Sequence, residues 1–198
     1  ISVSSGNPAL KPEHSRGWDV GVEQALDGDR RFVVDATYFR NDFDNLIIAG
    51  PPPTFTNMNI SRALTTGVEL TSTWQVFDDT YLNVTYTHTD ATNQVTGTRL
   101  LRRPPNKVAV GIDQYFLDRR ANLNFNLRWV DFRDDFDPIT FGTTQLPSYT
   151  VANLQGYYDY SKSVRFFGRI DNMFDKKYEE IFAYATPRFS VFAGVTIL

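Results

Sequence analysis

The sequence predicts an all-β protein whose architecture is an antiparallel up-and-down transmembrane β-barrel. Apolar and polar residues alternate with period two through most of the 198 residues, as they do in strands with one apolar and one polar face. Short turns and long loops also alternate strictly along the chain, which is typical of outer-membrane barrels. Aromatic residues make up 15% of the chain although its mean hydropathy is only -0.34. Half-polar membrane strands account for both values.

The composition excludes several other classes of protein. No run of residues approaches the roughly 18 apolar positions of a membrane-spanning helix, so a helical membrane protein is excluded. A net charge of -3 argues against nucleic acid as a partner. The chain contains no cysteine, which excludes zinc–thiolate sites, thiol catalysis and disulfides. It begins at Ile1, and we interpret this as the start of a mature product or of an internal fragment.

Two strands are predicted near the N-terminus, at residues 16–26 and 30–40. Asp27-Gly28-Asp29 lies between them and predicts a tight hairpin turn, because Asp and Gly tolerate positive φ. The stretch 41–59 is polar and contains three consecutive prolines, so we expect a long loop there and no strand interior.

Four further strands are predicted in the middle of the chain, at residues 60–76, 80–89, 107–116 and 121–130. The alternation is cleanest in the last of them. A short turn joins 60–76 to 80–89, and another joins 107–116 to 121–130. The connection between the pairs, residues 90–106, is long and basic.

The C-terminal part predicts three more strands, at residues 148–158, 163–171 and 187–198, which completes a count of nine. Residues 131–147 and 175–186 are predicted as long loops. The facing of the strand at 148–158 stays open, because its odd-numbered and even-numbered positions are both apolar.

The predicted faces suit a bilayer. In the first, third, fourth, fifth and sixth strands no charged residue falls on the apolar side within the predicted span, where an Arg or Lys facing lipid costs roughly 2–4 kcal/mol. Large aromatic residues lie near the predicted strand ends, where interfacial girdles belong. They are Trp18, Tyr38, Trp74, Tyr86, Phe116 and Trp129.

Several segments resemble the C-terminal β-barrel of TonB-dependent outer-membrane receptors, in the order of that family. These are residues 6–13 (GNPALKPE), 21–23 (GVE), 66–70 (TGVEL), 86–90 (YTHTD), 103–105 (RPP) and 171–178 (DNMFDKKY). The resemblance implies a 22-stranded barrel with a plugged lumen. The present strands, residues 1–198, would be its last nine, with the plug domain and the N-terminal barrel strands located upstream.

The resemblance also implies a function, which is active import of a scarce nutrient across the Gram-negative outer membrane. The tail at residues 178–188 looks most like the receptors for ferric siderophores and cobalamin, and those two branches stay open. Implied partners are outer-membrane lipid and lipopolysaccharide, a small-molecule ligand, the protein's own plug, and the TonB–ExbB–ExbD complex. The family usually ends on an aromatic residue, whereas this chain ends on Leu198, so we expect it to be trimmed at both ends.

Two groups of residues are candidates for function. Ligand-contact candidates lie in the predicted extracellular loops: Phe55, Arg99, Arg102, Arg103, Phe132, Phe136, Phe141 and Tyr184. Candidates for contact with the plug face the predicted lumen: Asp19, Glu23, Arg31, Asp35, Glu69, Arg128, Arg165, Arg169 and Asp171. The alternative for the lumen group is pairing with one another across neighbouring strands.

Other chemistry has less support in the sequence. The basic loop residues either clamp phosphate or an anionic ferric chelate, since Arg donates in pairs to such oxygens, or are simply solvated. The acidic run 131–137 either supplies calcium ligands or is a mobile loop. His14 and His88 are the only histidines and lie far apart. We therefore expect no catalytic site, metal or cofactor. The rival functions are a passive porin and a soluble β-sandwich that binds carbohydrate.

Overall fold

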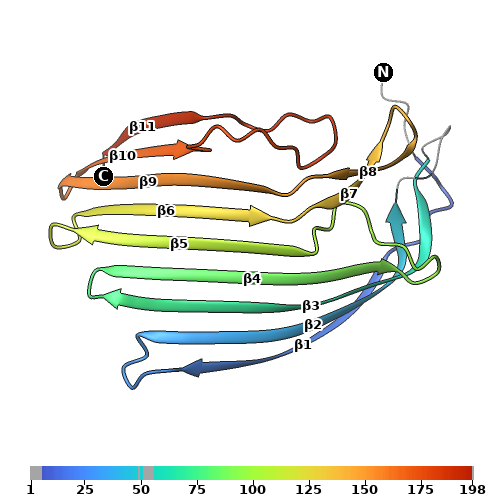
Figure 1. The fold of residues 1–198 in the computed structure, drawn as a ribbon, viewed down its shortest axis with the longest axis horizontal. Coiled ribbons are helices and arrows are strands. Elements are labelled where there is room, and N and C mark those ends of the chain that lie inside the picture. The colour runs from blue at the N-terminus through green and yellow to red at the C-terminus, as the bar shows by residue number, and fades with distance from the viewer. Residues whose placement is uncertain (1–5, 49, 51–55, 198) are drawn as a thin grey trace.

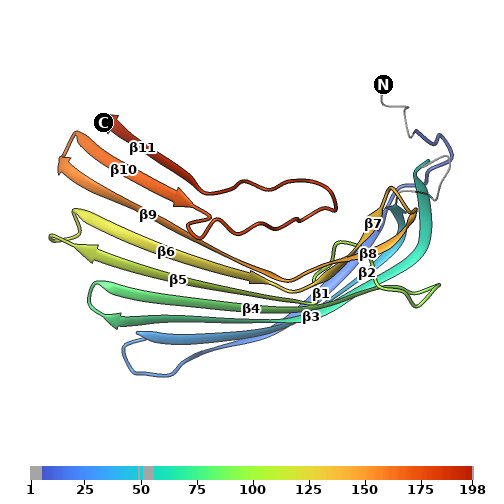
Figure 2. The same cartoon turned by 45° about the horizontal axis from the view of Figure 1, so that its top comes forward.

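The structure, a computed structural model, describes residues 6–48, 50 and 56–197. Within these residues nine strands form one antiparallel sheet in the order β1-β2-β3-β4-β5-β6-β9-β10-β11, and β7 and β8 form a separate hairpin. Figures 1 and 2 show a strongly curved sheet in which each strand lies beside the next. The predicted antiparallel up-and-down arrangement is confirmed. This part of the chain has no helix long and apolar enough to cross a membrane.

The strands differ widely in length. Their bounds are β1 (His14–Ala25), β2 (Phe32–Ile48), β3 (Met58–Phe77), β4 (Thr80–Asn93), β5 (Asn106–Phe116), β6 (Ala121–Val130), β7 (Arg133–Asp137), β8 (Gly142–Leu146), β9 (Tyr149–Ser161), β10 (Val164–Asp171) and β11 (Ser190–Ile197).

The expectation that residues 41–59 form no strand interior is wrong at both ends of this stretch. β2 continues to Ile48, and β3 begins at Met58. Polar residues are tolerated here because most of the two backbones is paired, as at Asp44 opposite Arg62, whose side chains are 3.8 Å apart. We infer that this part of the ladder extends beyond the apolar span, where neither face needs to be apolar. The prolines at 51–53 lie outside the described residues.

The connections keep the predicted order. The short turns at residues 26–31, 78–79, 117–120 and 162–163 all lie at one end of the sheet, on the left in Figure 1. The longer connections lie at the other end. Residues 131–147 were predicted as a long loop, but they contain the β7–β8 hairpin.

The register gives the sheet one apolar face and one polar face. Leu82, Ile112, Phe125 and Leu154 stand in one row across β4, β5, β6 and β9. This row settles the facing of β9, because Leu154 belongs to the apolar face and Val151 to the other. Exposed large apolar side chains in the described residues include Val20, Val22, Leu70, Trp74 and Ile112 on this apolar face, as expected of a wall that faces lipid.

Aromatic side chains lie at two levels of the apolar face. Phe32 and Trp74 pair beside the short turns, with ring centroids 5.6 Å apart. Tyr86 and Trp129 both stand opposite Val108, toward the long connections. Two such levels are the arrangement of interfacial girdles.

Candidate ligand-binding surface

Three long connections contact one another around a single buried carboxylate. We call them the loop cluster: residues 94–105, 131–148 and 172–189. Asp135 on β7 has an exposed fraction of 0%. Its Oδ1 accepts hydrogen bonds from Arg102 Nε at 2.6 Å and from the Phe136 backbone N–H at 2.7 Å. Its Oδ2 accepts from the Phe182 backbone N–H at 2.7 Å. Each connection therefore donates to Asp135.

Hydrogen bonds keep Asp135 charged despite its burial. Burial acts to raise the pKa of this carboxyl, but the donors at Phe182, Arg102 and Phe136 outweigh it, so the pKa is lowered. A second bond joins the first two connections directly, from the Arg102 backbone N–H to the carbonyl of Asp134 at 2.8 Å. Arg102, a ligand-contact candidate, is thus part of the framework.

An aromatic and charged contact joins the connection 172–189 to the polar face of the sheet. Tyr149 stacks on Tyr178 with ring centroids 4.2 Å apart. The Tyr149 hydroxyl donates to Glu180 Oε1 at 2.7 Å, and Arg128 Nη2 donates to the same oxygen at 3.0 Å. Hydrogen bonding from Tyr149 and the nearby charge of Arg128 hold the pKa of Glu180 below its ordinary value. Val130 and Val151 complete a small buried core here.

Arg133 supplies a further link between the hairpin and the connection 172–189. Its guanidinium donates to the backbone carbonyls of Glu179 and Glu180 and lies 5.4 Å from the centre of the Tyr149 ring. The side chain is buried, and its Nη1 has no hydrogen-bond partner among the described residues.

The base of the connection 172–189 is also fixed. The buried Asn172 amide donates to the carbonyls of Lys176 and Pro187 at 2.9 and 3.1 Å. Arg188 pairs with Asp175, with Nε 2.6 Å from Oδ1. The connection is therefore held at both its base and its tip, where Tyr184 is 69% exposed.

The candidate loop residues divide by exposure. Arg99, Arg103, Phe141 and Tyr184 are exposed, whereas Phe132 and Phe136 are half-buried. All six belong to the loop cluster, together with Arg102. Phe55 lies outside the described residues.

The lumen candidates lie on one face of the sheet, except Arg31. Arg31 precedes β2 in a short turn and pairs with Asp78 at 3.2 Å. Several others have an ion-pair partner, but in the described residues none of these pairs joins two candidates on neighbouring strands. Arg165 donates to Asp159 on β9 at 2.6 Å, and Arg169 lies 3.0 Å from Asp171. Glu23 pairs with Arg30. Asp19, Asp35 and Glu69 share this face. Contact with a plug stays a prediction.

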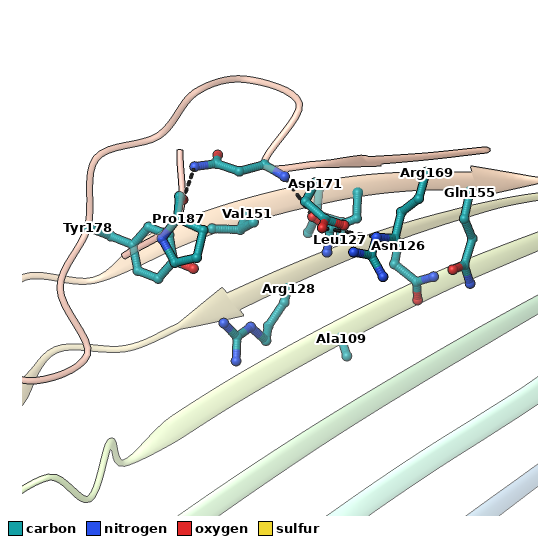
Figure 3. Close-up of a pocket in the computed structure, with 12 residues that line it drawn as sticks. Ala109, Asn126, Leu127, Arg128, Val151, Gln155, Arg169, Asp171, Tyr178 and Pro187 are labelled. Atoms are coloured by element: carbon teal, nitrogen blue, oxygen red, sulfur yellow. Dashed lines mark hydrogen bonds and ion pairs between the residues drawn. The ribbon is translucent and has the colours of Figure 1, made fainter. Parts of the chain in front are cut away.

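Two adjoining hollows run along this polar face, with volumes of about 490 and 560 Å³. Both are lined by Gln155 and Arg169, so they form one groove over β6, β9 and β10. Figure 3 shows Tyr178 and Pro187 at one end of the first hollow and Gln155 and Arg169 at the other.

The acidic run 131–137 has separate partners in place of a shared metal site. Asp131 accepts from Asn106 at 2.6 Å, and Asp137 accepts from the Thr140 hydroxyl at 2.7 Å. Residues 6–48, 50 and 56–197 contain no group of three or more His, Cys, Asp or Glu side chains placed to hold a metal.

An up-and-down sheet with one apolar face, one polar face and long connections at one end is typical of the wall of an outer-membrane β-barrel. Residues 1–173 match the family model described as TonB dependent receptor-like, beta-barrel. The chain therefore belongs to this family of TonB-dependent receptors.

Solved structures agree with this assignment. The ferric enterobactin receptor PfeA of Pseudomonas aeruginosa, in complex with enterobactin, is 25% identical with a TM-score of 0.76, and the match covers 97% of this chain. The siderophore receptor PirA of Acinetobacter baumannii is 21% identical with a TM-score of 0.76 over 97% of this chain. The copper transporter OprC is 19% identical with a TM-score of 0.77 over 96%. The chain spans 32% of the length of each of these proteins.

Proposed function

We propose that this chain forms the C-terminal portion of the barrel of a receptor that imports a ferric siderophore across the Gram-negative outer membrane. The observation that carries the proposal is the loop cluster, which presents exposed aromatic and basic side chains at one end of a membrane-type sheet. The likeness to PfeA, solved with enterobactin, supports this ligand class over cobalamin.

The exposed arginines suit an anionic ferric chelate. Arg99 and Arg103 are exposed and lie in the same connection. A guanidinium donates in pairs to carboxylate or catecholate oxygens. Tyr184 and Phe141 add flat apolar surface on the neighbouring connections.

The remaining barrel strands and the plug complete the proposed receptor. In this arrangement the plug packs against the polar face that carries the groove, and the TonB–ExbB–ExbD complex supplies energy through the plug. Lipopolysaccharide surrounds the outer half of the wall. The second candidate function is a passive porin, which the polar lumen face alone would also suit.

Uptake of radioactive iron by cells that carry the full-length receptor tests the proposal. With ferric enterobactin as the probe, we expect saturable uptake that stops when the proton gradient is collapsed. The double variant R99Q/R103Q is expected to lower the affinity roughly a hundredfold, since each of the two lost hydrogen bonds to a charged group contributes about 1.5 kcal/mol. The matched control is Lys162→Gln, in a short turn at the other end of the sheet. Uptake that is unsaturable and independent of the gradient would instead support the porin.

A further inference from the structure

We propose that the three connections of the loop cluster form one rigid body held together by Asp135, so that a ligand meets a preformed surface and not three independent loops. Asp135 is the positioning residue of this body. The part of the proposal that concerns ligand rests on the proposed function. The part that concerns rigidity stands on the contacts alone.

Asp135 requires hydrogen-bond donors from all three connections. A fully buried carboxylate is tolerated only when donors surround it, because burial of an unpaired charge is very costly. Its three donors come from residues 102, 136 and 182, at 2.6–2.7 Å. Moving one connection away would leave the charge short of a donor. Loss of the donor from any one connection therefore destabilises the buried carboxylate, and with it the hydrogen bonds to the other two connections.

Several contacts keep the connection 172–189 from rotating. A single anchor at Phe182 would leave this connection free to swing about its base. Arg133 binds the carbonyls of residues 179 and 180, and Tyr149 stacks on Tyr178. Anchors along residues 178–182, together with the Arg188–Asp175 pair at the base, fix its orientation as well as its position.

The rigid body carries the candidate ligand surface. Arg99 and Arg103 flank Arg102, whose side chain and backbone are both bound to the hairpin. Phe141 lies between β7 and β8, and Tyr184 lies two residues after Phe182. The exposed candidates thus sit on the segments that Asp135 connects. A ligand touching two of them would bind without ordering separate loops, which lowers the entropic cost of binding.

Hydrogen exchange measured by mass spectrometry on the full-length receptor in detergent tests the rigid body. In Asp135→Asn the side chain keeps one oxygen as an acceptor, but its NH2 group replaces the other oxygen and faces an N–H donor. We therefore expect Asp135→Asn to raise exchange at least tenfold in both 94–105 and 172–189, far along the chain from the substitution. The matched control is Asp134→Asn, the neighbouring residue, whose carboxylate has one side-chain contact at 3.5 Å; it should leave both segments unchanged. A rise confined to 131–148 would overturn the proposal.

A milder variant keeps the test valid if Asp135→Asn fails to fold. Arg102→Gln removes a side chain that is 46% exposed and whose ion-pair partner is Asp135 on β7, not a residue of 172–189. We expect exchange to rise in 172–189 all the same, and Arg102→Lys to restore most of the protection. A rise limited to 94–105 would contradict coupling through Asp135.

Binding of ferric enterobactin to the wild-type receptor tests the surface. Protection of the three segments in parallel is the expected result, with a slower association rate in Arg102→Gln. Protection of one segment alone would overturn the preformed surface. Failure of ferric enterobactin to bind would count against the proposed function, and the exchange measurements on the free receptor would still decide whether the cluster is one body.

Discussion

Asp135 and Glu180 show how single residues organise the long connections. Each is a carboxylate that accepts from donors on segments distant in sequence, with Phe182 47 residues beyond Asp135 and Arg128 52 residues before Glu180. Burial alone would favour the neutral form of Asp135. Because the donors prevail in the folded receptor, the charge contributes to the stability of the cluster.

These two residues predict how the loop cluster responds to acid. The folded-state pKa values of Asp135 and Glu180 lie below their ordinary values of 3.8 and 4.5. A lowered pKa stabilises the fold above the ordinary value, and this contribution is lost as the pH falls through the folded-state value. We therefore expect the cluster to stay closed from neutral pH to about pH 5 and to loosen below about pH 4.

Amide exchange of residues 172–189, corrected for the intrinsic pH dependence of exchange, measures this opening. The strands β4 to β6 serve as the internal control and should stay protected over the same range. Opening between pH 7 and pH 6 would contradict the assignment to these carboxylates. In Asp135→Asn the remaining pH dependence should come from Glu180, Asp175 and Asp137, whose pKa values are also lowered.

The strands show which parts of an element can be predicted from sequence. β6 has the predicted bounds, Ala121–Val130. Its residues alternate strictly, a short turn precedes it and a polar connection follows it, so the sequence allows one placement of the strand. β2 extends eight residues beyond the predicted end at Arg40, to Ile48. Its outer part, residues 41–48, mixes polar and apolar residues without regular alternation and resembles a loop, since only its pairing with β1 and β3 identifies it as strand. Alternation reveals a strand only where one face is apolar.

Gly67 is required by the close packing of β3 and β4. A Cβ there would lie 2.1 Å from the carbonyl oxygen of His88 and 2.5 Å from Phe39 Cζ. The ring can shift but the backbone carbonyl cannot, so Gly67→Ala should destabilise the barrel by about 1–3 kcal/mol. The measurement is the temperature at which the full-length receptor loses its folded band on an SDS gel. Gly28→Ala, where a Cβ meets nothing within 4 Å, should leave this temperature unchanged.

The orientation of the sheet in the membrane is tested by adjacent residues of β4. Val84 stands between Ser72 and Val110 on the apolar face, and Thr85 between Thr71 and Ala109 on the polar face. An Arg facing mid-bilayer lipid costs roughly 2–4 kcal/mol. We expect Val84→Arg to reduce folding into lipid vesicles strongly and Thr85→Arg to have little effect. Equal effects of the two variants would contradict the assignment of the faces.

At the scale of the whole molecule, the fold could be predicted from the sequence, whereas the loop cluster could be predicted only in part. The arrangement of strands depends on neighbours in the chain, so alternation and turn order suffice. The loop cluster depends on contacts between distant segments, such as Arg102 with Asp135 and Tyr149 with Tyr178. The same acidic run was therefore open to two interpretations, a calcium site or a mobile loop. No local pattern marks a carboxylate whose partners lie in other connections.

The curved sheet also makes a prediction about the chain taken alone. Among the described residues, β1 and β11 each pair with one neighbour only, so both present a row of unpaired backbone groups. In lipid each such group costs several kcal/mol, and in water open edges recruit other chains. We expect the isolated 198-residue chain to aggregate or form mixed oligomers when refolded in detergent, as measured by light scattering after size exclusion. The full-length receptor, refolded in the same detergent, should give one monodisperse species. A stable monomer of the isolated chain would mean that its edges close on each other, and the proposal of a larger barrel would fail.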